Sequence, residues 1–187
     1  MSKKLLVLDL DETLIHAQDK HFPYATHNTF HYYLAVRPGL ESFLDAIHLY
    51  YDLMIWSNNG QEYIDEIMDS FWPKHLPLVD IFTSNESSIK YENGYGIPFF
   101  KEIKKIAKRH GEYSKNQILA IDDKPQVHKR NYGNLIAISP FHGKPDSALD
   151  LLSTYLLSIK DVENVRSIEK RGWESRMKRE QEGLSIY

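Results

Sequence analysis

The stretch "LLVLDLDETLIH", Leu5–His16, decides the fold, because four consecutive aliphatic residues run directly into two aspartates spaced two apart. A short, continuous apolar run predicts a strand buried on both faces, the kind found in parallel sheets. Asp9 and Asp11 would then lie at the carboxyl end of that strand. In open α/β sheets ligands bind beyond these strand ends, so the two aspartates mark a candidate site.

Outward from this strand, further apolar runs alternate with segments of helical periodicity. Strands are predicted at 30–36, 51–57, 79–84, 117–123 and 134–139. Helices are predicted at 38–47, 61–70, 99–110, 146–159 and, interrupted by Gly172, 161–182. The alternation predicts an α/β fold with a doubly wound, mainly parallel sheet.

The chain has 187 residues, 42% of them hydrophobic, which suits one globular domain with a buried core. We assign residues 1–160 to that domain, and 161–187 to a charged helical extension that packs on the domain or trails from it. The irregular region 71–98 has room for a small hairpin or loop, but not for a separately folded lid. We therefore expect no large cap domain over the site.

Composition excludes several classes of function. The absence of cysteine rules out disulfides, thiolate metal ligands and thiol catalysis. A formal net charge of −3 argues against a surface that binds polyanions as a whole. No apolar run approaches the length of a membrane span, so we expect a cytoplasmic protein with no membrane partner.

The segment "DLDETLIH" resembles motif I of the phosphatases of the haloacid dehalogenase (HAD) superfamily. A closer resemblance is to the small RNA-polymerase C-terminal-domain phosphatases of FCP/SCP type, also described as NLI-interacting-factor-like. It extends over about Lys3–Ile159 and includes "VRPGLESFL", "LMIWSN", "FFKEIKKI" and "ILAIDDKP". The resemblance implies a HAD-like Rossmannoid fold and phosphoryl transfer through an aspartyl-phosphate.

By this resemblance Asp9 is the nucleophile, and Asp11 is the general acid and then the general base. Ser57 matches motif II, whose hydroxyl donates a hydrogen bond to the transferring phosphoryl oxygens, and Asn58 beside it is assigned to substrate binding. Lys101 matches motif III, whose ammonium neutralises the nucleophile and the phosphate. It is chosen among four lysines because "FFKEI" resembles the family's motif and because it lies at the predicted helix start.

Asp122 and Asp123 match motif IV and imply a Mg²⁺ site, since Mg²⁺ is bound by one or two carboxylates together with waters and phosphate. Asp9, the backbone carbonyl of Asp11 and one of this pair would be its ligands. The related small phosphatases carry Asn at the second position, so the sequence leaves open which aspartate holds the metal. Thr13 either braces the loop after Asp9 by side-chain hydrogen bonds or caps a helix.

Nine histidines raise the question of a zinc site. They are scattered, and none forms a pair four residues apart beside a carboxylate in the manner of a zinc protease. His27 and His31 are four apart, but the stretch around them is predicted to be extended. The sequence therefore predicts no zinc site.

An uncapped site favours a phosphate carried by something large. We expect a Mg²⁺-dependent phosphatase acting on a phosphorylated macromolecule, foremost phosphoserine or phosphothreonine in proteins. The alternatives are a phosphatase of metabolites or of nucleic-acid ends, nucleic acid entering only as substrate, and a non-catalytic phosphate-binding module of the same fold. The sequence does not predict the oligomeric state.

Overall fold

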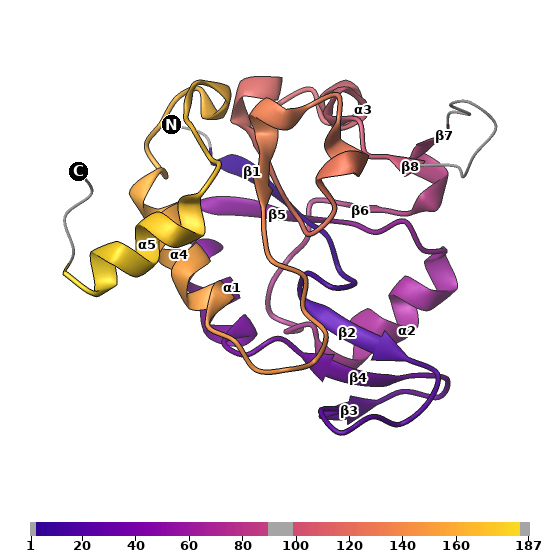
Figure 1. Ribbon diagram of the computed structural model, residues 1–187. Helices are drawn as coiled ribbons and strands as arrows, with labels where there is room; N and C mark the ends of the chain where they lie inside the picture. Colours follow the sequence, from indigo (N-terminus) through magenta and orange to yellow (C-terminus); the bar gives the residue numbers. More distant parts are fainter. Residues whose placement is uncertain (1–2, 90–98, 184–187) are drawn as a thin grey trace.

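A computed structural model describes residues 3–89 and 99–183 of the chain. Its centre is a five-stranded sheet of order β10-β9-β1-β5-β6, in which every neighbouring pair is parallel (Figure 1). The strands are β1 (Lys4–Leu8), β5 (Tyr51–Trp56), β6 (Ile81–Phe82), β9 (Ile118–Asp122) and β10 (Leu135–Ala137). The chain adds strands first on one side of β1 and then on the other. The predicted doubly wound α/β fold is confirmed.

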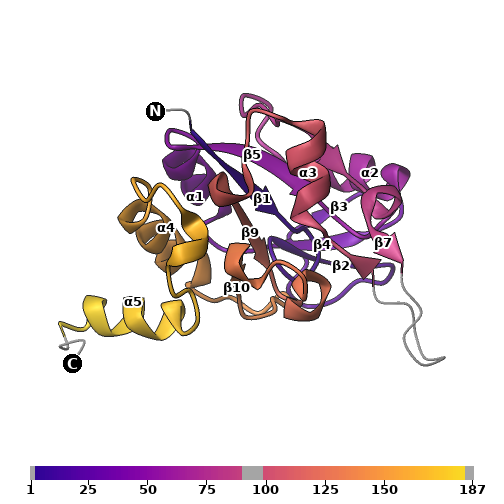
Figure 2. The ribbon, with the colours of Figure 1, turned by 90° about the horizontal axis from the view of Figure 1, so that it is seen from above.

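Helices cover both faces of this sheet (Figure 2). They are α1 (Leu40–Ile47), α2 (Gln61–Phe71), α3 (Ile103–Arg109), α4 (Ala148–Ser158) and α5 (Trp173–Gln181). Leu6 and Leu8 of β1 face the larger core, which contains buried residues of α1, α2, α4 and α5. Leu5 and Val7 face the smaller core, to which α3 contributes Ile103 and Ile106. The aliphatic run is thus buried on both faces, as its composition predicted.

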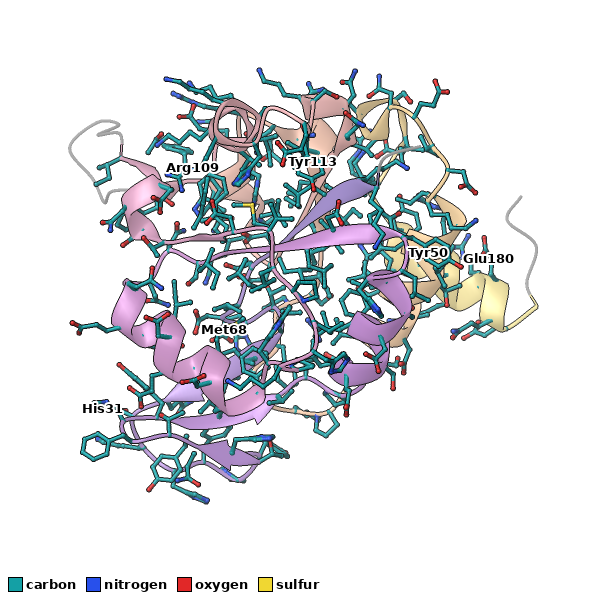
Figure 3. All side chains as sticks on the ribbon, turned by 180° about the vertical axis from the view of Figure 1, so that it is seen from behind. His31, Tyr50, Met68, Arg109, Tyr113 and Glu180 are labelled. Atoms are coloured by element: carbon teal, nitrogen blue, oxygen red, sulfur yellow. The ribbon has the colours of Figure 1, made fainter. Side chains whose placement is uncertain are left out.

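The segment between β1 and α1 forms a separate three-stranded antiparallel sheet of order β2-β4-β3, which we call the small sheet. Its strands are β2 (Ile15–Gln18), β3 (His27–Asn28) and β4 (Tyr33–Val36). The strand predicted at 30–36 is therefore shorter, because a tight turn in which Thr29 N donates to Tyr32 O occupies residues 29–32. Figure 3 shows His31 at this end of the molecule, far from Tyr113.

Residues 99–110 were expected to form one helix, and this is wrong for the first part. Phe99–Phe100 form β8, which pairs antiparallel with β7 (Ser88–Ile89), and α3 begins only at Ile103. Lys101 consequently lies in the connection before the helix. Residues 90–98, the last part of the region 71–98, lie outside the described residues.

The predicted helix 161–182 is also shorter than expected. Asn164 accepts a hydrogen bond from Arg166 N and starts a single 3₁₀ turn, η5 (Val165–Ser167). Gly172, the residue directly before α5, has a left-handed φ of 65°. Trp173 of α5 stacks on Tyr155 of α4 at 5.6 Å, and its indole donates to Ala137 O at 2.7 Å. The C-terminal segment thus packs on α4 and on the edge strand β10.

None of the helices among residues 3–89 and 99–183 is both long enough and apolar enough to cross a membrane.

Candidate functional site

The site is built where β1 ends. Asp9 N donates to Ile121 O at 3.1 Å, which extends the pairing of β1 with β9 by one residue. Leu10 O then accepts from the backbone N–H groups of Thr13 and Leu14, so the backbone curls back on itself. Glu12 sits in this curl with a φ of 62°, a left-handed conformation that non-glycine residues seldom adopt. The curl gives Asp9 and Asp11 different surroundings although they are two residues apart.

Asp9 lies in a buried ion-pair cluster with Lys101 and Asp122. Lys101 Nζ is 2.5 Å from Asp9 Oδ1 and 2.7 Å from Asp122 Oδ2, and the lysine side chain is only 2% exposed. The backbone of Lys101 is held at both ends, since its N–H donates to Val127 O and its carbonyl accepts from Asn131 Nδ2. We call Asp9, Lys101 and Asp122 the inner half of the site.

Burial and the nearby charge of Asp122 raise the pKa of Asp9, while the ammonium of Lys101 opposes this rise. Burial acts on Asp122 in the same direction, but the charges and hydrogen bonds of Lys101 and His128 outweigh it and lower the pKa of Asp122. Burial would lower the pKa of Lys101, yet the two carboxylates raise it. The lysine therefore stays charged, and one ammonium faces two buried carboxyl groups.

Thr13 braces the inner half. Its hydroxyl donates to Asp9 Oδ2 at 2.9 Å and accepts from Asp123 N at 3.2 Å. Its carbonyl accepts from the buried Arg37, which also forms two hydrogen bonds to Asp146. Of the two expectations for Thr13, the structure shows loop bracing, and no helix begins there.

His128 and Asn131 extend this network, and the sequence analysis did not identify either. His128 Nε2 is 3.1 Å from Asp122 Oδ2, and its Nδ1 is 3.0 Å from Asn131 Nδ2. The amide therefore donates to Nδ1, and Nε2–H donates to the carboxylate. Both residues follow "ILAIDD" within nine positions, and polar groups so close to a strand end were the available signal.

Asp123 differs from its neighbour in having an unused oxygen. Both oxygens of Asp122 accept hydrogen bonds, from Lys101, from His128 and from the backbone N–H of Lys124. Asp123 Oδ1 is buried and accepts none within the described residues, and Lys124 Nζ is 3.9 Å away. Carboxylate oxygens of Asp9, Asp122 and Asp123 lie within 4.8 Å of one another. A buried carboxylate oxygen that accepts no hydrogen bond, in a hard oxygen donor set, fits a divalent cation such as Mg²⁺.

Asp11 is held by neutral donors instead. Its carboxylate accepts from the hydroxyl of Tyr63 and from Asn59 Nδ2 at 2.8 Å, and Ser57 Oγ is 3.5 Å away. Burial and the charge of Asp11 together raise the pKa of Tyr63, so the phenol stays protonated. We call Asp11, Asn59 and Tyr63 the outer half of the site. The sequence analysis predicted the helix at 61–70 but did not identify Tyr63 as a site residue.

Ser57 and Asn58 follow the carboxyl end of β5. Ser57 is buried, and its backbone N–H donates to Phe82 O while its hydroxyl accepts from Asn59 N. Asn58 Oδ1 accepts from Ser87 Oγ at 2.6 Å, so its side chain is directed toward Ser87. Among the two asparagines, Asn59 is the one that reaches Asp11.

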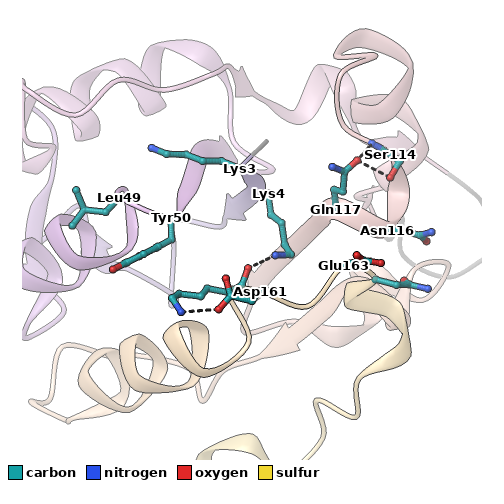
Figure 4. A pocket seen from close by; sticks show the side chains of 11 residues that line it. Lys3, Lys4, Leu49, Tyr50, Ser114, Asn116, Gln117, Asp161 and Glu163 are labelled. Atoms are coloured by element: carbon teal, nitrogen blue, oxygen red, sulfur yellow. Dashed lines mark hydrogen bonds and ion pairs between the residues drawn. The ribbon is translucent and has the colours of Figure 1, made fainter. Parts of the chain in front are cut away.

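The site is distinct from a cavity at the other end of the sheet. That cavity, of about 640 Å³, is lined by Lys3, Lys4 and Tyr50 among others, near the amino ends of β1 and β5 (Figure 4). The inner and outer halves lie at the carboxyl ends of the same strands. The cavity therefore does not contain the acidic cluster.

Comparison with known proteins agrees with the resemblance found in the sequence. Residues 4–166 match the model of the NLI interacting factor-like phosphatase family. Nuclear envelope morphology protein 1 of Saccharomyces cerevisiae is 27% identical over 190 residues, covering 89% of this chain and 41% of that protein. The mitochondrial import inner membrane translocase subunit TIM50 of Phytophthora infestans is 28% identical over 138 residues, covering 73% and 29%.

Ubiquitin-like domain-containing CTD phosphatase 1 of Xenopus laevis is 27% identical over 188 residues, covering 96% of this chain and 57% of that protein. The chain thus spans less than two thirds of each of these relatives. The structure of the fission yeast RNA polymerase II CTD phosphatase Fcp1 bound to beryllium fluoride has the same fold. Its TM-score is 0.58 at 19% identity, over 97% of this chain and 50% of that one. Because the family model spans most of the sequence, the chain belongs to the NLI interacting factor-like phosphatase family.

Proposed function

We propose that this protein is a Mg²⁺-dependent phosphatase that works through an aspartyl-phosphate at Asp9 and acts on phosphoserine or phosphothreonine in proteins. The observation that carries the proposal is the buried ammonium of Lys101 between Asp9 and Asp122. A carboxylate that approaches a phosphate meets repulsion of about 4 kcal/mol for unit charges 4 Å apart at an effective dielectric of about 20. A fixed positive charge beside the nucleophile offsets that repulsion.

In the first step the Asp9 carboxylate attacks phosphorus, and the bond from phosphorus to the ester oxygen breaks. Asp11 gives its proton to the departing alkoxide, so the alcohol leaves neutral. In the second step Asp11 takes a proton from water as the water oxygen attacks phosphorus. The bond between phosphorus and Asp9 breaks, inorganic phosphate leaves, and both carboxyl groups return to their starting states.

The remaining residues hold the phosphoryl group. Ser57 Oγ, at the end of β5, donates to a phosphoryl oxygen, and Lys101 neutralises a second. The metal would be held by Asp9, the backbone carbonyl of Asp11 and Asp123, whose free Oδ1 fits the role better than the fully bonded Asp122. Mg²⁺ bound there supplies positive charge to the transferring group.

Two observations support a protein substrate. The described residues contain no separately folded lid over the carboxyl ends of the strands, so a large phosphorylated partner has access. The Xenopus relative is named as a CTD phosphatase, and the fission yeast protein is named as an RNA polymerase II CTD phosphatase, whose substrate is a protein. Sugar phosphates and phosphorylated oligonucleotide ends are the competing substrates.

The test measures hydrolysis of p-nitrophenyl phosphate with and without Mg²⁺, and then of phosphopeptides, sugar phosphates and 3′- or 5′-phosphorylated oligonucleotides. Asp9→Asn should abolish Mg²⁺-dependent turnover. Asp69→Asn, which alters an exposed carboxylate on α2, should leave it unchanged. Equal turnover in wild type and Asp9→Asn would contradict the mechanism, and preference for sugar phosphates or oligonucleotides would contradict the substrate.

A second candidate is a phosphate-binding module without turnover. This candidate is favoured by the relative TIM50, which is named as a translocase subunit and not as a phosphatase. Phosphopeptide binding that is retained while no substrate is hydrolysed with Mg²⁺ or another divalent cation would support this candidate over the first.

A further inference from the structure

Two histidines far apart in sequence meet one carboxylate beside the site. His16 Nδ1 is 3.0 Å from Glu12 Oε1, and His142 Nδ1 is 2.5 Å from Glu12 Oε2. The imidazole rings stand edge to face with their centroids 5.7 Å apart. One ligand atom from each of the three side chains therefore lies within 4.8 Å of the others. Sequence spacing predicted no such group, because His142 belongs to a different segment.

The backbone fixes this arrangement. Glu12 occupies the left-handed turn after Asp11, and its carbonyl accepts from Phe141 N at 2.7 Å, which ties the loop after β10 to the turn. Gly143, next to His142, has a φ of 85°, and a Cβ there would lie 3.0 Å from the ring of Phe22. The loop that carries His142 therefore approaches the small sheet closely, and glycine permits that approach.

We propose that Glu12, His16 and His142 form a binding site for a divalent transition-metal ion such as Zn²⁺. Two imidazole nitrogens and one carboxylate oxygen are donors that Zn²⁺ and other divalent first-row transition-metal ions prefer. Mg²⁺ prefers oxygen ligands alone. Three protein ligands leave a position open for water or for an anionic group. The site shares no side chain with the carboxylates proposed to hold Mg²⁺.

Gln18 lies beside the second ring nitrogen of His16. Its Nε2 is 2.8 Å from His16 Nε2, so in this orientation the amide donates to the ring. A metal at Nδ1 would leave Nε2 protonated, and the amide would then have to turn by 180° so that its oxygen accepts from Nε2–H. The ring of Phe22, edge to face at 5.1 Å, limits rotation of His16.

The competing interpretation is a metal-free triad in which both Nδ1–H groups donate to Glu12. It uses the same atoms, but it predicts no specific uptake of metal. Direct metal binding therefore separates the two, and the measurement does not depend on phosphatase activity.

The experiment titrates the purified chain with Co²⁺ in excess Mg²⁺, which occupies the oxygen site, and follows the visible ligand-field absorption. We expect one Co²⁺ per chain, displaced by Zn²⁺. His142→Ala and His16→Ala should each weaken binding by about 100-fold or more, because even loss of an outer-shell partner costs about 10- to 100-fold. His142 is two-thirds exposed, so its replacement should leave the fold intact, as far-UV circular dichroism would verify.

His27→Ala is the matched control, since it removes an exposed histidine of the small sheet outside the group. It should bind Co²⁺ as the wild type does, and so should Asp123→Asn, while Gln18→Ala should bind about 10-fold more weakly. Unchanged affinity in His142→Ala, or loss of the signal in Asp123→Asn instead, would overturn the proposal. So would the absence of Co²⁺ uptake by the wild type.

Discussion

Asp9 and Asp11 are two residues apart, yet the inner and outer halves of the site hold them in opposite ways. Asp9 is buried and bound to an ammonium that is 2% exposed. Asp11 is half-buried and bound by a phenol and an amide, both neutral and one of them on an exposed residue. In the proposed mechanism Asp9 is therefore a preorganised nucleophile, whereas Asp11, which would gain and lose a proton, is better served by neutral partners.

The largest expected effect comes from breaking the inner half. Lys101→Met leaves two buried carboxyl groups without a cation, which should lower the free energy of unfolding by about 3–5 kcal/mol and abolish turnover. Urea denaturation measures the first, and p-nitrophenyl phosphate hydrolysis the second. Lys108→Met, on the exposed face of α3, is the control. A free energy of unfolding of Lys101→Met within about 0.5 kcal/mol of the wild-type value, which is the usual range for surface substitutions, would show that the ion pairs contribute little to stability.

The next effect tests the outer half. Tyr63→Phe removes the hydroxyl that donates to Asp11 and should lower kcat by about 10-fold, since a hydrogen bond to a charged group contributes about 1.5–3 kcal/mol. An unchanged kcat would assign Tyr63 to packing against Tyr32 alone.

A smaller effect distinguishes the two asparagines after Ser57. Asn59→Ala should reduce kcat by about fivefold, because a hydrogen bond from an exposed side chain contributes only about 1 kcal/mol. Asn58→Ala should leave kcat unchanged and lower the midpoint of urea unfolding, because its partner is Ser87. The reverse pattern would place Asn58, rather than Asn59, at the substrate.

The last expected effect is confined to acid pH and concerns Glu102, the residue after Lys101. Burial would raise the pKa of Glu102, but hydrogen bonds from Ser88, Arg130 and Lys104 outweigh it and lower the pKa from 4.5 to about 2. A lowered folded-state pKa stabilises the fold above pH 4.5, and this stabilisation is lost as the pH falls toward 2.

Glu102→Gln should therefore show a shallower loss of stability between pH 4.5 and 2 than the wild type. Urea midpoints across that range measure it, with the exposed Glu112→Gln as control. Parallel curves for wild type and Glu102→Gln would contradict the lowered pKa.

The sequence predicted what depends on local pattern. The aliphatic run before Asp9, and the apolar runs before Ser57 and Asp122, identified three strands whose carboxyl ends meet at one edge of the sheet. The resemblance then selected Lys101 among the lysines of "FFKEIKKIAKRH". The helix boundary near Lys101 was not predictable from helical periodicity, because Phe99–Phe100 instead pair with Ser88–Ile89 as β8 and β7.

The site residues that the sequence did not predict depend on contacts between segments that are far apart in the sequence. Asn131 holds the carbonyl of Lys101 from 30 positions away, and Tyr63 reaches Asp11 from 52 positions away. His142 meets Glu12 only because the loop after β10 is tied to the turn after Asp11. Helical or strand periodicity does not predict contacts between residues that are far apart in the sequence. These residues therefore resemble ordinary core or surface positions.

The position of β1 between β5 and β9 has a consequence for synthesis of the chain. β1 is made before both of its neighbours, and its second neighbour ends only at Asp122. Those roughly 110 further residues take about 5–20 s to synthesise at about 5–20 residues per second. During that interval the aliphatic run of β1 is on the nascent chain without both of its neighbouring strands. The charges of Lys3, Lys4 and Asp9, on either side of that run, oppose aggregation.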